Sequence, residues 1–261
     1  MSNCRLTELY DKASKHSQYQ VLASPIRSVM DGTLGNVRSR WEEERLHFML
    51  SRLSFDGATI ADVGGNTGYF TLELVDRGVC KALYIEGNKA HSEFVREAVS
   101  LLGWNDRVDV VSRYLGFEED QDRFEVDVCL LLNVLHHVGD DYGAGVRSVS
   151  QAKDAILDSL RQLAGMARYL VFQLGYNWKG DIRHPLFENG EKKELIDFIR
   201  YGVDEYWDIE SIGVAQRLSG GRVVYTEVGP RNIGRDDRLG EFLNRPLFIM
   251  RSKKRGPLSV A

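Results

Sequence analysis

Residues 62–70 have the sequence DVGGNTGYF, which combines an acid with three closely spaced glycines. This glycine stretch follows ATIADV (58–63), a short apolar run whose β-branched residues favour a strand. It leads into TGYFTLELVDRG (67–78), whose apolar spacing favours a helix. Glycines at such a strand-to-helix turn let the backbone bend sharply and let a ligand approach it closely. The stretch therefore predicts a ligand-binding turn within an α/β unit.

The chain after this turn alternates between strand and helix patterns. The predicted strands are 80–86, 107–112, 126–133 and 168–174, and the predicted helices are 89–103, 148–165 and 191–203. Strand 126–133 is almost entirely apolar, as expected of a strand that is buried on both faces. Strands that alternate with helices indicate a parallel sheet covered by helices on both faces.

The two ends of the chain have other patterns. The first 54 residues place apolar side chains at helical spacing, interrupted by the turn-rich segment 24–36. Near the other end we expect a helix at about 207–218 and then two strands, RVVYTEV (222–228) and RPLFIMR (245–251). Two late strands that follow five strand–helix units suggest an antiparallel sheet edge.

The nucleotide motifs with the best-known spacing do not occur here. The dinucleotide pattern G-x-G-x-x-G, started at Gly64, fails because Asn66 and Tyr69 stand where its other glycines belong. The phosphate-binding pattern G-K-[ST] is absent from the whole sequence. Glu86 ends the second predicted strand, 24 residues after Asp62, where an acid accepts hydrogen bonds from both hydroxyls of a ribose. Together these residues favour a turn that binds a nucleoside-type ligand over a purely structural turn. The failed G-x-G-x-x-G pattern disfavours NAD as that ligand.

Three segments of the chain resemble the class I S-adenosylmethionine-dependent methyltransferases. The glycine stretch is similar to their first motif, Glu86 matches the acid at the end of their second strand, and LLNVLHHVGDD (131–141) is similar to their fourth-strand motif. The resemblance covers roughly residues 40–175 and the two final strands. It implies a doubly wound, mostly parallel α/β sheet of seven strands in the order 3-2-1-4-5-7-6, with strand 7 antiparallel.

The resemblance also implies a division of the chain. Residues 1–54 would form an N-terminal helical extension that acts as a lid over the methyl acceptor. Residues 55–255 would form the methyltransferase domain, and residues 256–261 a short tail.

The resemblance implies that S-adenosylmethionine binds at the glycine stretch. Asp62 would lie near the amino group of its methionine part, Glu86 would hold its ribose, and Asn133 would face the methionine part or the acceptor. Many family members have an acid after strand three that contacts adenine, whereas VSRYL (111–115) has none, so backbone contacts or stacking would replace it. The predicted cofactor residues are Asp62, Gly64, Gly65, Asn66, Gly68, Glu86, Gly87, Arg113, Tyr114 and Asn133.

Two adjacent histidines, His136 and His137, follow the most apolar strand. Ligands of open α/β sheets bind beyond the carboxyl ends of the strands, and histidine suits proton removal at neutral pH. His136 stands where small-molecule O-methyltransferases place their general base, and His137 is the second candidate. The alternative is a histidine that packs on the strand end or on the cofactor. Adjacent histidines do not readily point at one ion, so no metal is expected.

Two segments are candidates for binding the acceptor. GYNWKGDIRHP (175–185) mixes aromatic and cationic side chains, which suit a sugar, a phosphate or a polar aromatic, although an ordinary surface loop has the same composition. SKHSQYQ (14–20) would contribute to a lid, and GPRNIGRDDR (229–238) adds three arginines. The predicted acceptor residues are Tyr19, Gln20, Tyr176, Trp178, Lys179, Arg183 and His184.

The composition narrows the class of acceptor. The chain of 261 residues has a net charge of −4, so a surface devoted to nucleic acid is disfavoured. A weaker resemblance, to the methyltransferase part of bacterial polysaccharide-chain-terminating enzymes, ranks saccharide or phosphate acceptors above nucleic acid. We therefore expect O-methylation of a small molecule or glycan. The alternatives are an RNA-modifying methyltransferase and a methyltransferase-like binding protein without turnover.

The remaining features concern location and assembly. No apolar run reaches the length of a membrane span, and the N-terminus has no apolar core of signal-peptide length, so a cytoplasmic protein is expected. The basic run RSKKR (251–255) would make at most a weak contact with anionic lipid or nucleic acid. The oligomeric state is left open.

Overall fold

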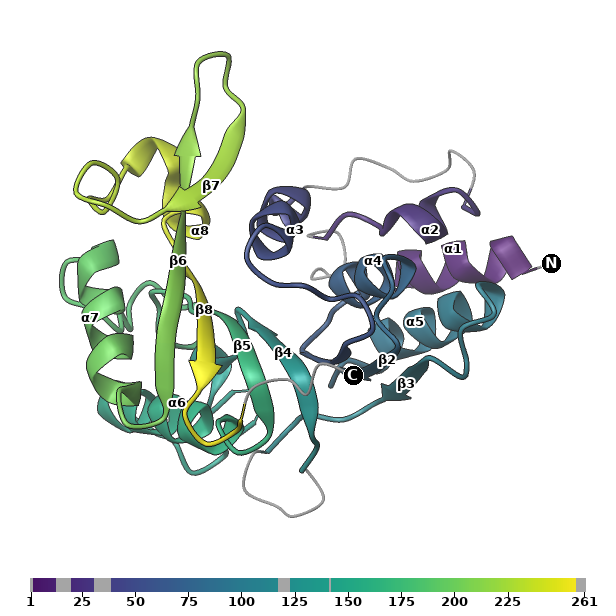
Figure 1. The fold of residues 1–261 in the computed structure, drawn as a ribbon, viewed down its shortest axis with the longest axis horizontal. Coiled ribbons are helices and arrows are strands. Elements are labelled where there is room, and N and C mark those ends of the chain that lie inside the picture. Colours follow the sequence, from purple (N-terminus) through teal and green to yellow (C-terminus); the bar gives the residue numbers. More distant parts are fainter. Residues whose placement is uncertain (1, 13–19, 31–38, 117–122, 141, 257–261) are drawn as a thin grey trace. The chain divides into compact units, whose positions relative to one another are not determined.

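The computed structural model describes residues 2–12, 20–30, 39–116, 123–140 and 142–256 (Figure 1). The chain forms two compact units, which we describe one at a time. The first comprises Met1–Leu46 with Leu53–Leu115, and the second comprises His47–Arg52 with Gly116–Ala261. The predicted boundaries of the lid, domain and tail remain a prediction.

The first unit is built on three parallel strands in the order β3-β2-β1. These are β1 (Thr59–Val63), β2 (Lys81–Ile85) and β3 (Val108–Val111). Helix α4 (Tyr69–Asp76) joins β1 to β2, and helix α5 (Lys89–Leu101) joins β2 to β3. The register pairs Val63 with Ile85, and Ile85 with Val111. The residues that follow these three strand ends therefore share one edge of the sheet.

In the described residues, three helices precede this sheet: α1 (Ser2–Lys12), α2 (Ser24–Arg27) and α3 (Glu42–Leu50). The apolar spacing predicted α1 and α3, whereas α2 forms at the start of the segment 24–36 that was expected to be turn-rich, with Pro25 in its first turn. Helix α1 packs on α5, where the rings of Tyr10 and Phe94 have centroids 5.8 Å apart. Helix α2 is tied to α4, because the backbone N–H of Ser24 donates to Glu73 Oε1 at 2.5 Å.

The second unit contains five strands in the order β4-β5-β8-β6-β7. They are β4 (Val126–Leu132), β5 (Ala167–Gln173), β6 (Trp207–Arg217), β7 (Val223–Glu227) and β8 (Leu247–Ser252). Strands β4 and β5 are parallel, whereas β8 is antiparallel to both of its neighbours, β5 and β6. An antiparallel strand inserted after β5 is what the sequence predicted for strand 7, and the α/β fold class is confirmed.

The prediction of a helix near 207–218 is wrong, because this segment is strand β6. It is hydrogen-bonded on both sides, to β8 and to β7, and its register with β8 shifts between Ile209 and Ser211. Pairing with two neighbours outweighs the helix propensity of Ala215 and Gln216, and propensity is only a weak guide when tertiary contacts compete. The described residues therefore contain eight strands rather than seven, and β6 is the additional one. It lies between β8 and β7, whereas the predicted order placed the strands 245–251 and 222–228 side by side.

Two long helices, α6 (Val149–Leu163) and α7 (Lys192–Val203), pack together in the second unit. Gly202 of α7 has no room for a side chain, because a Cβ there would overlap the side chain of Leu157. The indole of Trp207 donates to the carbonyl of Leu160 at 2.7 Å and fixes α6 against the start of β6. The short helices are η3 (Leu135–His137), η4 (Trp178–Gly180), η5 (Asp237–Leu239) and α8 (Gly240–Leu243).

The basic run near the C-terminus is not an isolated tail. Its first two residues belong to β8, where Arg251 pairs with Asp208 and Glu210 at 3.0 and 2.6 Å. Lys253 pairs with Asp208 at 3.4 Å. Most of this positive charge is therefore matched by acids of the same unit, and its contact with lipid or nucleic acid remains a prediction.

In the described part of the chain, no helix is both long enough and apolar enough to cross a membrane.

Candidate functional site

The glycine stretch forms a sharp turn between β1 and α4. Gly64, Asn66 and Gly68 have φ angles of 70°, 52° and 76°, a left-handed conformation that glycine and asparagine tolerate best. Backbone hydrogen bonds close the turn, from Gly64 to Ile85 at 2.8 Å and from Gly68 to Gly65 at 2.9 Å. The turn thus lies at the carboxyl edge of the first unit's sheet, where the sequence analysis placed it.

Tyr84 of β2 supports this turn from within. A Cβ at Gly65 would lie 2.6 Å from the ring of Tyr84 and 3.0 Å from Asp62 Oδ2, so this position has no space for a side chain. The Tyr84 hydroxyl donates to the carbonyl of Asn66. Tyr84 was not predicted as a site residue. In the sequence it is one aromatic residue of the second predicted strand, and its pairing with Asp62 is visible only in the structure.

Glu86 links the turn to the start of α5. Its Oε2 accepts the backbone N–H of Asn66 at 2.9 Å, and its Oε1 accepts that of Asn88 at 2.7 Å. A carboxylate has roughly four lone-pair sites, so it can accept hydroxyl donors such as those of a ribose in addition to backbone amides. The two amides also orient the carboxylate before any ligand arrives.

Asp62 is buried at the end of β1 and is only 3% exposed. Its Oδ2 accepts a hydrogen bond from the Thr71 hydroxyl at 2.7 Å. Burial raises the pKa of Asp62 to about 6, the negative charge of Glu86 adds to this, and Arg45 opposes it. A cationic group of a ligand beside Asp62 would offset the cost of burying its charge, so the residue fits an ammonium group.

The sequence analysis also missed two buried charges of α3. Glu42 and Arg45 are 1% and 4% exposed, and Arg45 Nη2 lies 4.0 Å from Glu42 Oε1. The guanidinium of Arg45 lies 5.1 Å from the ring centre of Phe70. In sequence, EEER (42–45) looks like the solvent-exposed start of a helix. The burial of Glu42 and Arg45 depends on tertiary packing, which the sequence pattern does not show.

Gln20, a predicted acceptor residue, lies at the glycine turn in the structure. Its Oε1 accepts hydrogen bonds from the Thr67 hydroxyl at 2.8 Å and from the backbone N–H of Tyr69 at 3.4 Å. It therefore caps the first turn of α4 from a distant segment. Tyr19, predicted beside it, is outside the described residues.

Tyr114 lies over Gly87, where a Cβ would overlap its ring. The side chain is 49% exposed although it packs against this backbone. Nearby, the hydroxyls of Ser92 and Ser112 are 2.6 Å apart and join α5 to the end of β3. An exposed ring next to Glu86 suits stacking on a planar base. Arg113, the other predicted stacking residue, is half-buried.

In the second unit, Asn133 follows β4 with a left-handed φ of 62°. Its Nδ2 donates to Gln173 Oε1 at 3.0 Å, and its Oδ1 accepts from Arg245 Nη1 at 2.7 Å. Gln173 Nε2 donates in turn to the carbonyl of Arg245 at 3.0 Å. These three residues form a closed ring of hydrogen bonds, which we call the Asn133 triad. Gln173 and Arg245 were not predicted.

His136 is 3% exposed and packs against Gly175. Burial lowers the pKa of His136 well below its usual range, and the charges of Arg245 and His137 add to the effect. The backbone N–H of Gly175 donates to Nδ1 at 3.4 Å, so the neutral ring has its proton on Nε2. His137 is half-buried, with its ring centre 4.3 Å from that of His136.

The two predicted aromatic residues of the loop after β5 are buried within it. Tyr176 and Trp178 are 3% and 6% exposed. The Tyr176 hydroxyl donates to the carbonyl of Asn244 at 2.8 Å, and the Trp178 indole donates to that of Val138 at 2.6 Å. These side chains shape the loop, and their ring faces are largely covered.

The predicted cationic residues of this loop are more accessible. Lys179 has its ammonium 4.6 Å from the Trp178 ring centre. Arg183 and His184 have side chains that are 81% and 50% exposed, and both pair with Asp181, at 2.6 and 3.3 Å. Hydrogen bonds from Arg183 hold the pKa of Asp181 well below its usual range.

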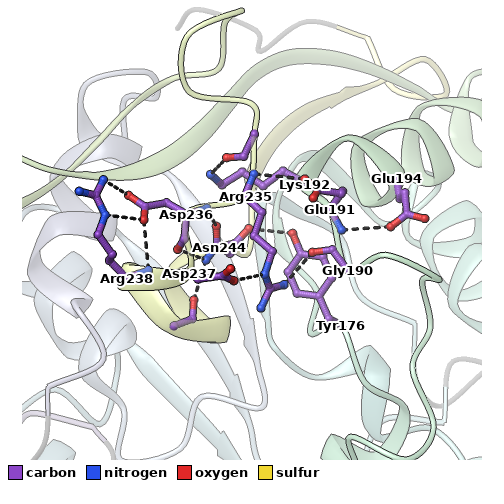
Figure 2. A network of polar contacts seen from close by, with 12 residues as sticks. Tyr176, Gly190, Glu191, Lys192, Glu194, Arg235, Asp236, Asp237, Arg238 and Asn244 are labelled. Atoms are coloured by element: carbon purple, nitrogen blue, oxygen red, sulfur yellow. Dashed lines mark hydrogen bonds and ion pairs between the residues drawn. The ribbon is translucent and has the colours of Figure 1, made fainter.

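The arginines of segment 229–238 are mostly engaged with neighbouring acids, as Figure 2 shows. Arg235 pairs with Asp237 at 2.7 Å, and Arg238 pairs with Asp236 at 2.8 Å. The buried ammonium of Lys192 donates to two carbonyls of the same segment, at 3.2 and 2.6 Å. This network fixes the segment to the start of α7.

The described residues contain no group of three or more histidines, cysteines, aspartates or glutamates that could hold a metal ion.

Comparison with known proteins gives matches at the level of structure. No family model matches the chain, and no curated protein matches it. Two structures of WbdD have TM-scores of 0.58 at 14% identity; the match spans 94% of this chain but only 41% and 46% of the WbdD chains. Streptococcus pneumoniae Sp1610, named as a tRNA (m1A22) methyltransferase, has a TM-score of 0.46 at 16% identity, over 83% of this chain and 72% of its own.

A further match is Pyrococcus horikoshii PH1948, named as an RNA methyltransferase, with a TM-score of 0.46 and 13% identity over 95% of this chain and 98% of its own. At such identities the likeness extends to the fold alone. Combined with the strand orders of the two units and the antiparallel β8, the match to the WbdD structures shows a Rossmann-like α/β fold.

Proposed function

We propose that this protein is an S-adenosylmethionine-dependent methyltransferase that methylates an oxygen atom of a small molecule or glycan. The observation that supports this most is the pair of acids at the carboxyl edge of the first unit. Asp62 is buried with a raised pKa and suits an ammonium group, and Glu86 is oriented by two backbone amides and suits ribose hydroxyls. The cofactor contains both groups.

The residues of the first unit would bind the cofactor. The turn 64–68 would lie against it, with Asp62 beside its amino group and Glu86 on its ribose. Tyr114 would stack on the adenine. This stacking would replace the adenine contact that an acid after strand three makes in many family members. When bound, S-adenosylmethionine would supply a sulfonium methyl group; an acceptor oxygen would bond to the methyl carbon as the carbon–sulfur bond breaks in line and S-adenosylhomocysteine leaves.

A histidine of the second unit would remove the acceptor's proton. The contacts of His136 favour a neutral ring whose Nδ1 accepts a hydrogen bond, which makes it a weak base. His137 is adjacent and less buried, which supports His137 as the base and His136 as its packing partner. Lys179, Arg183 and His184 would contact the acceptor, while Tyr176 and Trp178 hold the loop in shape.

The net charge of −4 and the pairing of the basic run support a small-molecule or glycan acceptor in the cytoplasm rather than a nucleic acid. The sequence resemblance to chain-terminating enzymes of polysaccharides points the same way.

Calorimetry on the full chain tests the proposal. S-adenosylhomocysteine should bind with a dissociation constant in the micromolar range or below, and NAD should not bind. Tight NAD binding without any response to S-adenosylhomocysteine would overturn the assignment. Methyl transfer from labelled S-adenosylmethionine to a panel of sugars, phenols and RNA then separates the acceptor classes. Transfer to RNA alone would replace the proposed acceptor.

A further inference from the structure

The side-chain amide of Asn133 can adopt only one orientation. Arginine only donates hydrogen bonds, so the atom of Asn133 that faces Arg245 Nη1 at 2.7 Å must be its oxygen. Gln173 gives the same result independently. Its Nε2 donates to the Arg245 carbonyl, so its Oε1 faces Asn133 and requires a donor there. Turning the Asn133 amide over would place oxygen against oxygen and N–H against N–H.

The orientation decides what Asn133 offers to a ligand. Its oxygen accepts from Arg245, which approaches from one side of the triad. One of its two Nδ2 hydrogens is used by Gln173. In the part of the chain that the structure describes, the second Nδ2 hydrogen makes no hydrogen bond. Asn133 is half-buried and Gln173 is fully buried, so of the two amide side chains of the triad Asn133 is the one that a ligand can reach.

Two further observations mark this position as a binding point. Asn133 follows the carboxyl end of β4, the edge at which open α/β sheets bind ligands. Its backbone is left-handed, a conformation in which asparagine is enriched, and residues other than glycine with positive φ often stand at functional sites. Glu241 pairs with both Arg245 Nε and Arg245 Nη2, at 3.0 and 2.6 Å, so the triad has no unmatched positive charge.

We propose that Asn133 is a hydrogen-bond donor to the methyl acceptor and thereby selects a hydroxyl over an amino group. A hydroxyl accepts the Nδ2 hydrogen through one lone pair and keeps its own hydrogen for a base. An amino group on an aromatic ring donates but hardly accepts, and it would face a donor. Because the triad is neutral, alcohols and phenols are favoured over phosphates. The inference rests on the proposed function and specifies its acceptor atom.

Nuclear magnetic resonance of the full chain, ¹⁵N-labelled at asparagine, tests the donor role. The Asn133 side-chain signals are assigned through the backbone and checked by their loss in Asn133→Asp. Phenol and aniline are the probes, since they differ only in the group that is to be methylated. We expect phenol to shift one Nδ2 proton of Asn133 and leave the proton bonded to Gln173 in place, while aniline shifts neither. Equal shifts by both probes, shifts by aniline alone, or no shift by either would overturn the inference.

Ligand-observed titration of the variants gives a second measurement. Asn133→Asp keeps the oxygen that Arg245 binds but replaces the donor with an acceptor. Phenol affinity should fall about tenfold, the change expected for losing one hydrogen bond. The control Asn105→Asp makes the same change at an exposed asparagine and should leave phenol affinity unchanged. An Asn133→Asp protein that binds phenol as tightly as the wild type would also overturn the inference.

Failure of the proposed function would appear separately. Binding of S-adenosylhomocysteine is measured by calorimetry on the same samples, and it reports on the first unit. A protein that shows the phenol-specific shift without binding S-adenosylhomocysteine would retain the donor role of Asn133 and lose the methyltransferase assignment.

Discussion

The glycine turn of the first unit and the Asn133 triad of the second are built in opposite ways. Apart from Gln20, the turn is held by residues of one strand–helix–strand unit, since Asn66 and Glu86 are 20 positions apart and Glu86 and Asn88 only two. The triad joins residues that are 40, 72 and 112 positions apart. A local strand–turn–helix unit can be recognised in sequence, whereas the triad requires the strand order of the second unit.

The two regions also differ in charge. The first buries carboxylates, and burial raises the pKa of Asp62 more than Arg45 lowers it. The second buries a neutral histidine and partly buries a guanidinium that Glu241 neutralises. One region therefore suits a cationic ligand group, and the other offers neutral donors. The following predictions test this contrast.

The largest effect is expected at the histidines. His137→Ala should lower kcat by about 10²–10⁴-fold, the usual loss of a general base, and leave S-adenosylhomocysteine affinity nearly unchanged. His136→Ala should lower kcat less, because its buried ring is a weak base, but should lower the free energy of unfolding by opening a cavity beside Gly175. Steady-state kinetics and urea unfolding of both variants measure this. If His136→Ala alone abolished turnover in a folded protein, the roles would be reversed.

The next effect concerns the carboxylate that the turn orients. Glu86→Ala should weaken S-adenosylhomocysteine binding by roughly 1–3 kcal/mol, because charge-assisted hydrogen bonds to the ribose are lost. Glu93→Ala is the matched control, since Glu93 lies on α5 and only pairs with Lys89 at 3.7 Å. Calorimetry on both variants decides the point. Equal affinities would show that Glu86 has a purely structural role in the turn.

Asp62 should show a trade-off between stability and binding. A raised pKa means that the folded state holds this proton more tightly than the unfolded state. Protonation of Asp62 therefore stabilises the folded state fully below pH 3.8, and this stabilisation is lost as the pH rises through about 6. At pH 7.5 the free energy of unfolding of Asp62→Asn should therefore exceed that of the wild type by about 1–2 kcal/mol. This is part of the roughly 3 kcal/mol to which a pKa shift of two units corresponds.

Urea unfolding at pH 7.5, 6 and 4.5 measures this difference, which should shrink as the pH falls. The same variant should bind S-adenosylhomocysteine more weakly, because its ammonium loses an ionic partner. Asp109→Asn, at an exposed aspartate of β3, is the control and should leave S-adenosylhomocysteine binding unchanged. A variant that is less stable at every pH would contradict the raised pKa.

The smallest effect is expected at the surface of the acceptor loop. Arg183→Ala should raise KM for the acceptor by about two- to fivefold, because Asp181 already pairs with this exposed guanidinium. The melting temperature should not change. Arg200→Ala on α7 removes another exposed arginine and should alter neither quantity. Steady-state kinetics with the identified acceptor compare the two, and identical KM values would remove Arg183 from the acceptor site.

Particular elements show where sequence-based prediction succeeds. Every predicted strand from 58–63 to 168–174 is present, because apolar and β-branched residues dominate each of these short segments. The helix expected near 207–218 fails because Ala215 and Gln216 favour a helix locally, while two hydrogen-bonded neighbours make the segment a strand. Tyr176 and Trp178 were expected to face a ligand, yet hydrogen bonds to distant carbonyls bury both.

The sequence by itself determined the glycine turn, the acid that follows β2 and the alternation that defines the α/β fold. These features depend on backbone geometry and on contacts within one strand–helix–strand unit. Only the tertiary structure decided how Asn133 is oriented. Because β8 runs antiparallel to β5, its first residue Leu247 pairs with Gln173, and this brings Arg245 to the edge where β4 ends. No local pattern contains that information, since hydrogen bonds between distant residues exist only once the strands are ordered.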